Sequence, residues 1–363
     1  MDEPVLNALA PAASPATPEA RANSICFLRL FFASLVVYGH SWYLGGFSNE
    51  PIESYVFNHS INLAGIGVRA FFAISGYLVM QSERRMTSAR GFLFNRFLRI
   101  YPGLWACLLF TGLLMPVIFL HFDRSNAENW SSAFSYVQNN WWQPRSQVGI
   151  AGLFQGIPRE GDLNGSLWTL PYEIGCYVCL ALAGWFGATA GRALPAWLLG
   201  AALLGLYCND VLLPAHAVFF KSEGRGLCAW FVCGSLMALL PESKLRSRLS
   251  GSVVAAVAAA WLASFRLGVP SLIGPVSLTL IVLWLSWNLP LKGFETKAGG
   301  DFSYGLYIYA YPVQQALAFI GVVKFGVVVY FLLSLVIALA LAILSWHTIE
   351  KPALRFKFRP ASI

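Results

Sequence analysis

Two ionisable residues, Arg29 and His40, lie inside the first long apolar run of the chain, ICFLRLFFASLVVYGHSWYL. This run is long enough to cross a bilayer, which takes about 20 apolar residues. An arginine at mid-membrane costs about 2.5–3.5 kcal/mol, so its presence needs a reason. A spacing of eleven residues returns to nearly the same helix face about 16 Å further along the axis. A fixed cation and a side chain that exchanges protons near neutral pH therefore indicate chemistry or transport within the membrane.

A carboxylate and two further arginines also lie in or beside apolar runs. Glu173 follows the motif GSLWTLPY, at a depth where a carboxylate is costly unless it is paired or functional. It could orient a histidine, hold an arginine or take a proton, and a purely structural Glu–Arg pair is the alternative. Arg96 and Arg99 in RFLRIYP share a helix face. Guanidinium groups pair with phosphate oxygens, so these arginines suit either a cytoplasmic phosphorylated cosubstrate or lipid phosphates.

Other residues in the apolar runs have simpler interpretations. The Ser75–Gly76 pair in GVRAFFAISGYL fits close helix packing. As a nucleophile Ser75 would need an adjacent base, which the sequence does not reveal. Cys176 and Cys179 form a CxxC pair, but no second pair or histidine cluster lies nearby. We interpret them as small apolar packing residues.

The run SYGLYIYAYPVQQ combines an aromatic stripe with two amides. Tyr304, Tyr307 and Tyr311 fall on one helical stripe, which is typical of core packing. Gln314 and Gln315 add polarity that a lipid-facing helix would avoid. This segment is therefore expected inside the bundle.

The largest segment between spans, about residues 122–164, is rich in aromatic and amide side chains. Flat rings can cover the apolar faces of sugars while polar groups bind the hydroxyls, so one interpretation is a sugar site. The other is an interfacial aromatic belt. The residues concerned are Trp130, Trp141, Trp142, Asn139, Asn140, Gln143, Asp162 and Asn164.

The composition is that of an integral membrane protein. Of the 363 residues, 57% are hydrophobic and 12% are charged, whereas soluble domains average about 25% charged residues. The apolar runs are too long for strands, so we expect an all-α membrane bundle. The net charge of +8 does not indicate nucleic acid, because the basic residues lie between apolar runs as membrane topology requires.

The hydropathy pattern predicts about ten transmembrane helices. With the N-terminus in the cytoplasm, 16 of the 25 lysines and arginines fall in cytoplasmic segments and 7 in outer segments, which favours cytoplasmic location of both termini. No internal repeat is visible, which counts against many transporter folds. The expected spans are about 25–44, 63–81, 100–121, 165–187, 194–213, 226–241, 250–266, 270–289, 303–323 and 327–347.

Six motifs in a fixed order resemble acyltransferase family 3. They are Arg29 and His40 with ten residues between them, FFAISGYL, RFLRIYP, SLWTLPYE, SYGLYIYAYP and the closing IEKPALR. Members of this family are bacterial inner-membrane enzymes that O-acylate sugars of O-antigens, exopolysaccharides and Nod factors. The resemblance implies an acyltransferase membrane domain over residues 24–355. A disordered cytoplasmic tail is expected at 1–23, and a second cytoplasmic tail at 356–363.

The resemblance also implies roles for single residues and ligands. His40 matches the essential histidine of the family and Arg29 its partner arginine. Arg96 and Arg99 match the RxxR arginines, and Glu173 matches the acidic end of the SLWTLxxE motif. The implied donor is an acyl-coenzyme A, most often acetyl-CoA, and no metal ion is expected. The implied partners are a carbohydrate or lipid-linked glycan acceptor and membrane lipids.

Two positions depart from the family pattern. Many relatives have a histidine near Ala310 and Tyr311, so no second histidine is assigned from that motif. Arg69 stands where relatives often have a small residue or an aspartate. It could pair with Glu173 or with an acidic substrate, or lie at the outer interface.

These features lead to a hypothesis of acyl transfer to a sugar hydroxyl. His40 is the expected general base, an effect worth about 10²–10⁴ in rate. Glu173 is expected to orient His40, while Arg29, Arg96 and Arg99 bind coenzyme A. The alternative is a transporter or flippase of acyl or lipid-linked sugar units. A structural scaffold would not explain why ionisable residues share helix faces.

Overall fold

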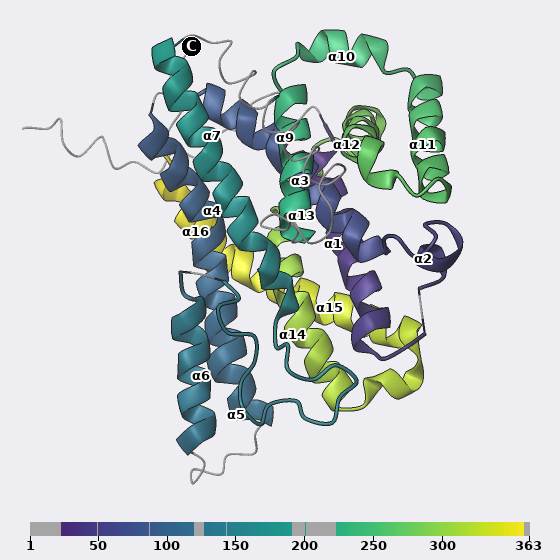
Figure 1. The fold of residues 1–363 in the computed structure, drawn as a ribbon. Coiled ribbons are helices and arrows are strands. Elements are labelled where there is room, and N and C mark those ends of the chain that lie inside the picture. The colour runs from purple at the N-terminus through teal and green to yellow at the C-terminus, as the bar shows by residue number, and fades with distance from the viewer. Residues whose placement is uncertain are drawn as a thin grey trace, which may run out of the picture.

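A computed structural model of the chain describes residues 23–48, 50–86, 88–119, 127–142, 144–190, 200 and 223–358. These residues form helices and no strand, so the predicted all-α class is confirmed for them (Figure 1). The predicted tail at 1–23 and the predicted span at 194–213 lie outside the described residues, apart from Asn23 and Gly200.

The longer helices are α1 (Ile25–Leu44), α3 (Leu63–Arg84), α4 (Ala89–Leu109), α6 (Ala127–Asn140), α7 (Leu170–Ala190), α9 (Glu223–Met237), α11 (Gly251–Arg266), α12 (Pro270–Asn288), α14 (Ser303–Phe319) and α15 (Val327–Ser345). The shorter elements are α2 (Pro51–Tyr55), η2 (Phe110–Leu114), α5 (Met115–Phe119), η3 (Gly165–Thr169), α10 (Glu242–Arg248), α13 (Phe294–Ala298), η4 (Val322–Phe325), η5 (Trp346–Glu350), α16 (Lys351–Ala353) and η6 (Leu354–Phe356).

Five helical stretches are long and apolar enough to cross a membrane, namely Ile25–Leu44, Leu63–Arg84, Ala89–Phe119, Gly165–Trp185 and Val327–Phe356. A sixth results if Gly226–Met237 and Glu242–Arg248, which are bent by 104°, form one span. Helix α11 and most of α12 are apolar but shorter. The protein is therefore a multi-pass helical membrane protein, and the predicted number of about ten spans is not confirmed.

Helix α14 occupies the interior of the bundle between α1 and α15. Its residues Ser303–Ala318 are all buried. Gln314 donates hydrogen bonds of 2.9 Å to the Val37 carbonyl and the Ser41 hydroxyl on α1. Gln315 donates to two carbonyls of the segment that precedes η3. The amide nitrogens of both glutamines thus donate hydrogen bonds inside the protein, while their buried amide oxygens have no partner among the described residues.

Glycines bring α3 close to both α1 and α9. A Cβ atom on Gly76 would lie 1.9 Å from the Phe231 carbonyl oxygen of α9. On the α1 side, a Cβ on Gly39 would lie 2.6 Å from the Ala64 nitrogen, and one on Gly67 would lie 2.6 Å from the Phe32 carbonyl oxygen. Small residues allow such backbone contact in membranes. Because these pairs run in opposite directions, the N-terminal half of α1 lies beside the second half of α3.

The C-terminal segment returns to the start of α4. The Asn95 side chain donates to the Phe358 carbonyl at 3.0 Å and accepts from the Phe358 nitrogen at 2.8 Å. Hydrogen bonds therefore hold residues just beyond the expected domain end at 355 beside the arginines of α4.

Candidate active site

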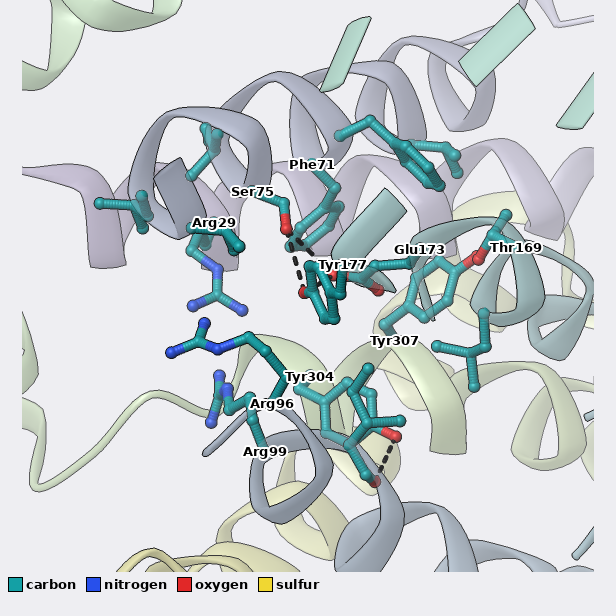
Figure 2. A pocket seen from close by; sticks show the side chains of 17 residues that line it. Arg29, Phe71, Ser75, Arg96, Arg99, Thr169, Glu173, Tyr177, Tyr304 and Tyr307 are labelled. Atoms are coloured by element: carbon teal, nitrogen blue, oxygen red, sulfur yellow. Dashed lines mark hydrogen bonds between the residues drawn. The ribbon is translucent and has the colours of Figure 1, made fainter. Parts of the chain in front are cut away.

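A cavity of about 90 Å³ lies among α1, α3, α4, η3, α7 and α14. Figure 2 shows three arginines at one end, a hydrogen-bonded threonine and tyrosine at the other, and a group of hydroxyl and carboxylate side chains between them. The polar residues that line it are Arg29, Ser75, Arg96, Arg99, Thr169, Glu173, Tyr177, Tyr304 and Tyr307. The structure thus brings together four of the five residues predicted for the site.

At the arginine end, one carboxylate holds two of the three guanidinium groups. Asp301 forms ion pairs with Arg29 and with Arg99, the latter at 2.6 Å. Its other oxygen accepts hydrogen bonds from the hydroxyl and the backbone nitrogen of Ser303, at the start of α14. Arg99 also lies 3.9 Å from a carboxylate oxygen of Glu350. These contacts join α1, α4, η5 and α14 at one point.

The ion pairs at Asp301 are strong enough to outweigh its burial. Burial alone would raise the pKa of the Asp301 carboxyl. The guanidinium groups of Arg29 and Arg99 and the hydrogen bonds from Ser303 favour the charged form, and the pKa falls from 3.8 to about 2. Asp301 is therefore ionised at neutral pH.

Arg96 differs from its two neighbours. Its guanidinium donates a long, weak hydrogen bond of 3.4 Å to the Ser82 hydroxyl. Its buried Nε has no hydrogen-bond partner in the described part of the chain. The guanidinium lies 5.9 Å from the Phe92 ring and 6.0 Å from the Tyr177 ring. No carboxylate forms an ion pair with it among the described residues. Arg96 is thus the arginine available to an anionic ligand.

Three side chains form a hydrogen-bonded group in the middle of the cavity (Figure 2). The Ser75 hydroxyl lies 3.1 Å from Glu173 Oε1 and 3.1 Å from the Tyr177 hydroxyl. Tyr177 donates to the same Glu173 oxygen. Glu173 is in the first turn of α7, directly after η3, so its position follows from the short 3-10 helix that precedes it.

The far end of the cavity is closed by a hydrogen bond between helices. Thr169 Oγ1 and the Tyr307 hydroxyl lie 2.8 Å apart and both side chains are buried. Tyr304, one turn earlier on α14, donates to the Ile100 carbonyl at 2.8 Å. The predicted tyrosine stripe therefore lines the cavity with Tyr304 and Tyr307.

His40 lies outside this cavity, further along α1. Its ring contacts Tyr311, the next residue of the tyrosine stripe, with ring centroids 5.3 Å apart. Its buried Nδ1 has no hydrogen-bond partner among the described residues. The hydrogen bonds of Glu173 go to Ser75 and Tyr177, so the expected pairing of Glu173 with His40 is not found. The reason is that Glu173 faces Ser75 of α3 inside the cavity, whereas His40 lies outside it, beside Tyr311.

Two further expectations can be compared with the contacts. Arg69 donates to the Gly65 carbonyl at 3.1 Å and lies 6.0 Å from the Trp230 ring. These contacts differ from the pairing with Glu173 that we considered.

Trp141 stacks on Trp105 of α4, with ring centroids 4.9 Å apart. The two interpretations of the outer aromatic residues, a sugar site and an aromatic belt, both remain open.

Several polar residues of the segment at about 122–164 form contacts that hold its shape. Asp162 forms an ion pair with Arg145 at 2.9 Å. Asn164 donates to the Ile308 carbonyl of α14 at 2.9 Å. Asn140 donates to the Gln147 carbonyl at 2.9 Å.

Two residues of this site, Asp301 and Tyr177, were not predicted from the sequence. Asp301 lies two residues before Ser303, the start of the SYGLYIYAYP motif, so an acid at the edge of an apolar run was the available signal. Tyr177 lies four residues after Glu173, which places the two on one helix face.

Comparison with known proteins shows the family to which the chain belongs. Residues 23–347 match the family described as acyltransferase domain. The chain belongs to this acyltransferase family. It is 32% identical to an O-acetyl transferase of Shigella phage Sf6, over 91% of the chain and 96% of that protein. It is 27% identical to Nodulation protein 10 of Rhizobium leguminosarum bv. viciae, over 92% and 94%. No solved structure matches the chain.

The protein is thus an acyltransferase with a polar cavity inside a membrane helix bundle. The family match covers every helix that lines the cavity. The cavity is accordingly the candidate active site of the acyltransferase.

The ion pairs of Asp301 lead to a stability prediction. Removing one partner of a buried pair costs about 3–5 kcal/mol, so Asp301→Asn should lower the thermal unfolding temperature markedly in detergent. Asp162→Asn, in a half-exposed pair with Arg145, is the matched control and should cost at most about 1 kcal/mol.

The pH dependence of this effect has a defined sign. The folded-state pKa of Asp301 is about 2, below its ordinary 3.8. Its contribution is therefore complete above about pH 4 and is lost as the pH falls toward 2. The difference between wild type and Asp301→Asn should be constant from about pH 5 to pH 8. Equal stability of the two proteins at neutral pH would contradict the assignment.

Proposed function

We propose that this acyltransferase moves an acyl group, in the simplest case acetyl, from acyl-coenzyme A to a hydroxyl of a cell-surface carbohydrate. The observation that carries the proposal is the polarity of the cavity. An arginine that has no ion-pair partner among the described residues lies at one end, and a carboxylate hydrogen-bonded to two hydroxyls lies within reach of a ligand bound there. Phosphates suit the first end, and a reacting carbonyl suits the middle.

The arginine end fits the phosphates of coenzyme A. Guanidinium groups bind phosphate oxygens in a planar fork. Arg96 is the principal ligand in this proposal, while Arg29 and Arg99 contribute positive charge through the cluster fixed by Asp301. A cavity of about 90 Å³ encloses only the thioester end of such a donor, so the nucleotide remains outside on the arginine side.

The arginine side corresponds to the cytoplasm in the proposed topology. The 16 to 7 distribution of basic residues supports cytoplasmic termini. This orientation, in a bacterial inner membrane, exposes Arg96 to the compartment that contains acyl-CoA. The acceptor then approaches from the other side, where His40 and Tyr311 lie.

His40 is the proposed base for the acceptor hydroxyl. Among the described residues its buried Nδ1 has no hydrogen-bond partner, and a neutral imidazole nitrogen can accept a proton in the transition state. The printed name of the phage relative, O-acetyl transferase, supports oxygen as the acceptor atom. The acceptor class that we propose is an exopolysaccharide, an O-antigen or a lipid-linked precursor of either.

Donor binding gives the first test of this function. Arg96→Ala should weaken the binding of acetyl-CoA to the purified protein, because a charge-assisted hydrogen bond worth about 1.5–3 kcal/mol is lost. That corresponds to about tenfold or more in Kd. Isothermal titration in detergent measures it. Arg90→Ala, an exposed arginine on the same helix, is the control and should bind like wild type, and equal Kd values for all three proteins would exclude the phosphate site.

Glycan chemistry gives the second test. A deletion strain should lose acetyl signals from its surface glycan by NMR, and wild-type protein should restore them. His40→Ala should insert normally but restore about 10²–10⁴-fold less acetylation, because the acceptor hydroxyl lacks its base. His347→Ala, an exposed histidine outside the cavity, should restore it fully. Full acetylation by His40→Ala would remove this role, and transport without new ester in vitro would favour the transporter.

A further inference from the structure

Ser75 has a neighbour that the sequence could not reveal. It lies on α3, in the wall of the cavity, and its hydroxyl is 3.1 Å from a carboxylate oxygen of Glu173 on α7. The two residues are 98 positions apart in the chain. The adjacent base that a serine nucleophile requires is therefore present.

The arrangement has the three parts of an activated nucleophile. Such a site needs a nucleophile, a base within about 2.6–3.2 Å and a third group that orients the base. Ser75 is hydrogen-bonded to Glu173, and Tyr177 donates to the same carboxylate oxygen. Tyr177 also lies 3.1 Å from the serine oxygen. The three side chains form a closed triangle that fixes the direction of the carboxylate.

Serines elsewhere in these helices behave differently. A serine inside a helix usually satisfies its hydroxyl on the carbonyl four residues earlier. Ser34 does so with Leu30 at 3.0 Å, and Ser41 does so with Val37 at 2.8 Å. The described hydrogen bonds of Ser75 go instead to two side chains of another helix. The contrast indicates that Ser75 is held for contact with whatever occupies the cavity.

The neighbouring glycine explains how Ser75 acquires this position. Gly76 packs against the Phe231 carbonyl of α9 without room for a Cβ atom. The next residue back, Ser75, consequently faces α7 and the cavity. Our interpretation of the pair as helix packing therefore holds for Gly76 but not for Ser75.

We propose that Ser75 accepts the acyl group from acyl-coenzyme A as an ester before the group passes to the acceptor. The inference rests on the proposed function, because it needs the donor thioester in this cavity. The arginine end and the Thr169–Tyr307 end leave Ser75 between them (Figure 2). A donor with phosphates at Arg96 presents its thioester to this stretch of the cavity.

The first step balances with the groups present. The Ser75 oxygen attacks the thioester carbonyl, an oxygen–carbon bond forms and its proton passes to Glu173. The carbon–sulfur bond breaks, and the electron pair leaves with the sulfur as a thiolate. Thiols ionise near pH 8.5 in water, so the released thiolate takes up a proton from the solvent at neutral pH.

The second step returns the enzyme to its initial state. The acceptor hydroxyl attacks the Ser75 ester, a new oxygen–carbon bond forms and the bond to the serine oxygen breaks. Glu173 returns its proton to Ser75. The proton of the acceptor passes along water molecules in the opened cavity to His40, which then releases it to the solvent. For this step the Thr169–Tyr307 hydrogen bond must open, because it closes the cavity toward Tyr311 and His40. Two steps thus give Glu173 and His40 separate tasks.

Isotope exchange tests the intermediate without an acceptor. Purified protein is incubated with acetyl-CoA and radiolabelled coenzyme A, and the label entering acetyl-CoA is measured. An acyl-enzyme produces exchange in the absence of acceptor, as ping-pong kinetics require, whereas direct transfer does not. Acid-quenched protein is digested in parallel, and the acetylated peptide is located by mass spectrometry.

The variants separate the two steps. Ser75→Ala should lose exchange and peptide labelling, and Glu173→Gln should slow both by about 10²–10⁴. His40→Ala should retain exchange and labelling but fail to acetylate the glycan. Ser75→Cys should carry a thioester that neutral hydroxylamine removes. Ser34→Ala, which loses only a bond within its own helix, is the matched control and should behave as wild type.

Each outcome decides between the proposals. Wild-type exchange that is lost in Ser75→Ala, with the label on the Ser75 peptide, supports the intermediate. Exchange that persists in Ser75→Ala, or label on another residue, overturns it. Glycan acetylation from acetyl-CoA without exchange also overturns it and leaves the proposed function intact. A wild-type protein that neither binds nor uses acetyl-CoA overturns the proposed function itself.

Discussion

The carboxylate of Asp301 connects parts of the chain that are far apart in sequence. It pairs with Arg29 of α1 and Arg99 of α4, and it accepts hydrogen bonds at the start of α14. Two buried guanidinium groups at this depth would be costly without it. The same contact fixes two of the three arginines that line the cavity, while Arg96 has no carboxylate partner among the described residues. Stability and ligand binding are therefore assigned to different arginines of one motif.

The two ends of the cavity therefore differ in chemical character. Its arginine end suits an anionic group, its middle contains the group formed by Ser75, Glu173 and Tyr177, and its far end is closed by Thr169 and Tyr307. Beyond that end the tyrosine stripe of α14 continues to Tyr311 and His40. A donor entering from one side and an acceptor entering from the other would meet along α14. In the proposed mechanism the donor and the acceptor thus have separate half-sites around one buried helix.

Much of this arrangement could be predicted from single-helix patterns. The helical class, the buried amides of α14 and the gathering of Arg29, Arg96, Arg99 and Glu173 all follow from the cost of polar groups in apolar runs. The pairing of the helices could not be predicted, because the residue pattern of one helix does not specify which helix packs against each of its faces. Glu173 consequently faces Ser75 rather than His40. The predicted number of about ten spans is not confirmed, because only five or six helical stretches of the described residues are long and apolar enough to cross a membrane, while α11 and most of α12 are shorter.

The most direct test is a cryo-EM structure of the full chain with an acetyl-CoA analogue whose sulfur is replaced by a methylene group. The account predicts that the analogue's phosphates contact Arg96 and that its carbonyl carbon lies about 3–3.5 Å from the Ser75 oxygen, the separation of a near-attack geometry. The Asp301 ion pairs with Arg29 and Arg99 should remain in place. An analogue bound outside the cavity, or one with its carbonyl beside His40 and its phosphates away from Arg96, would contradict it.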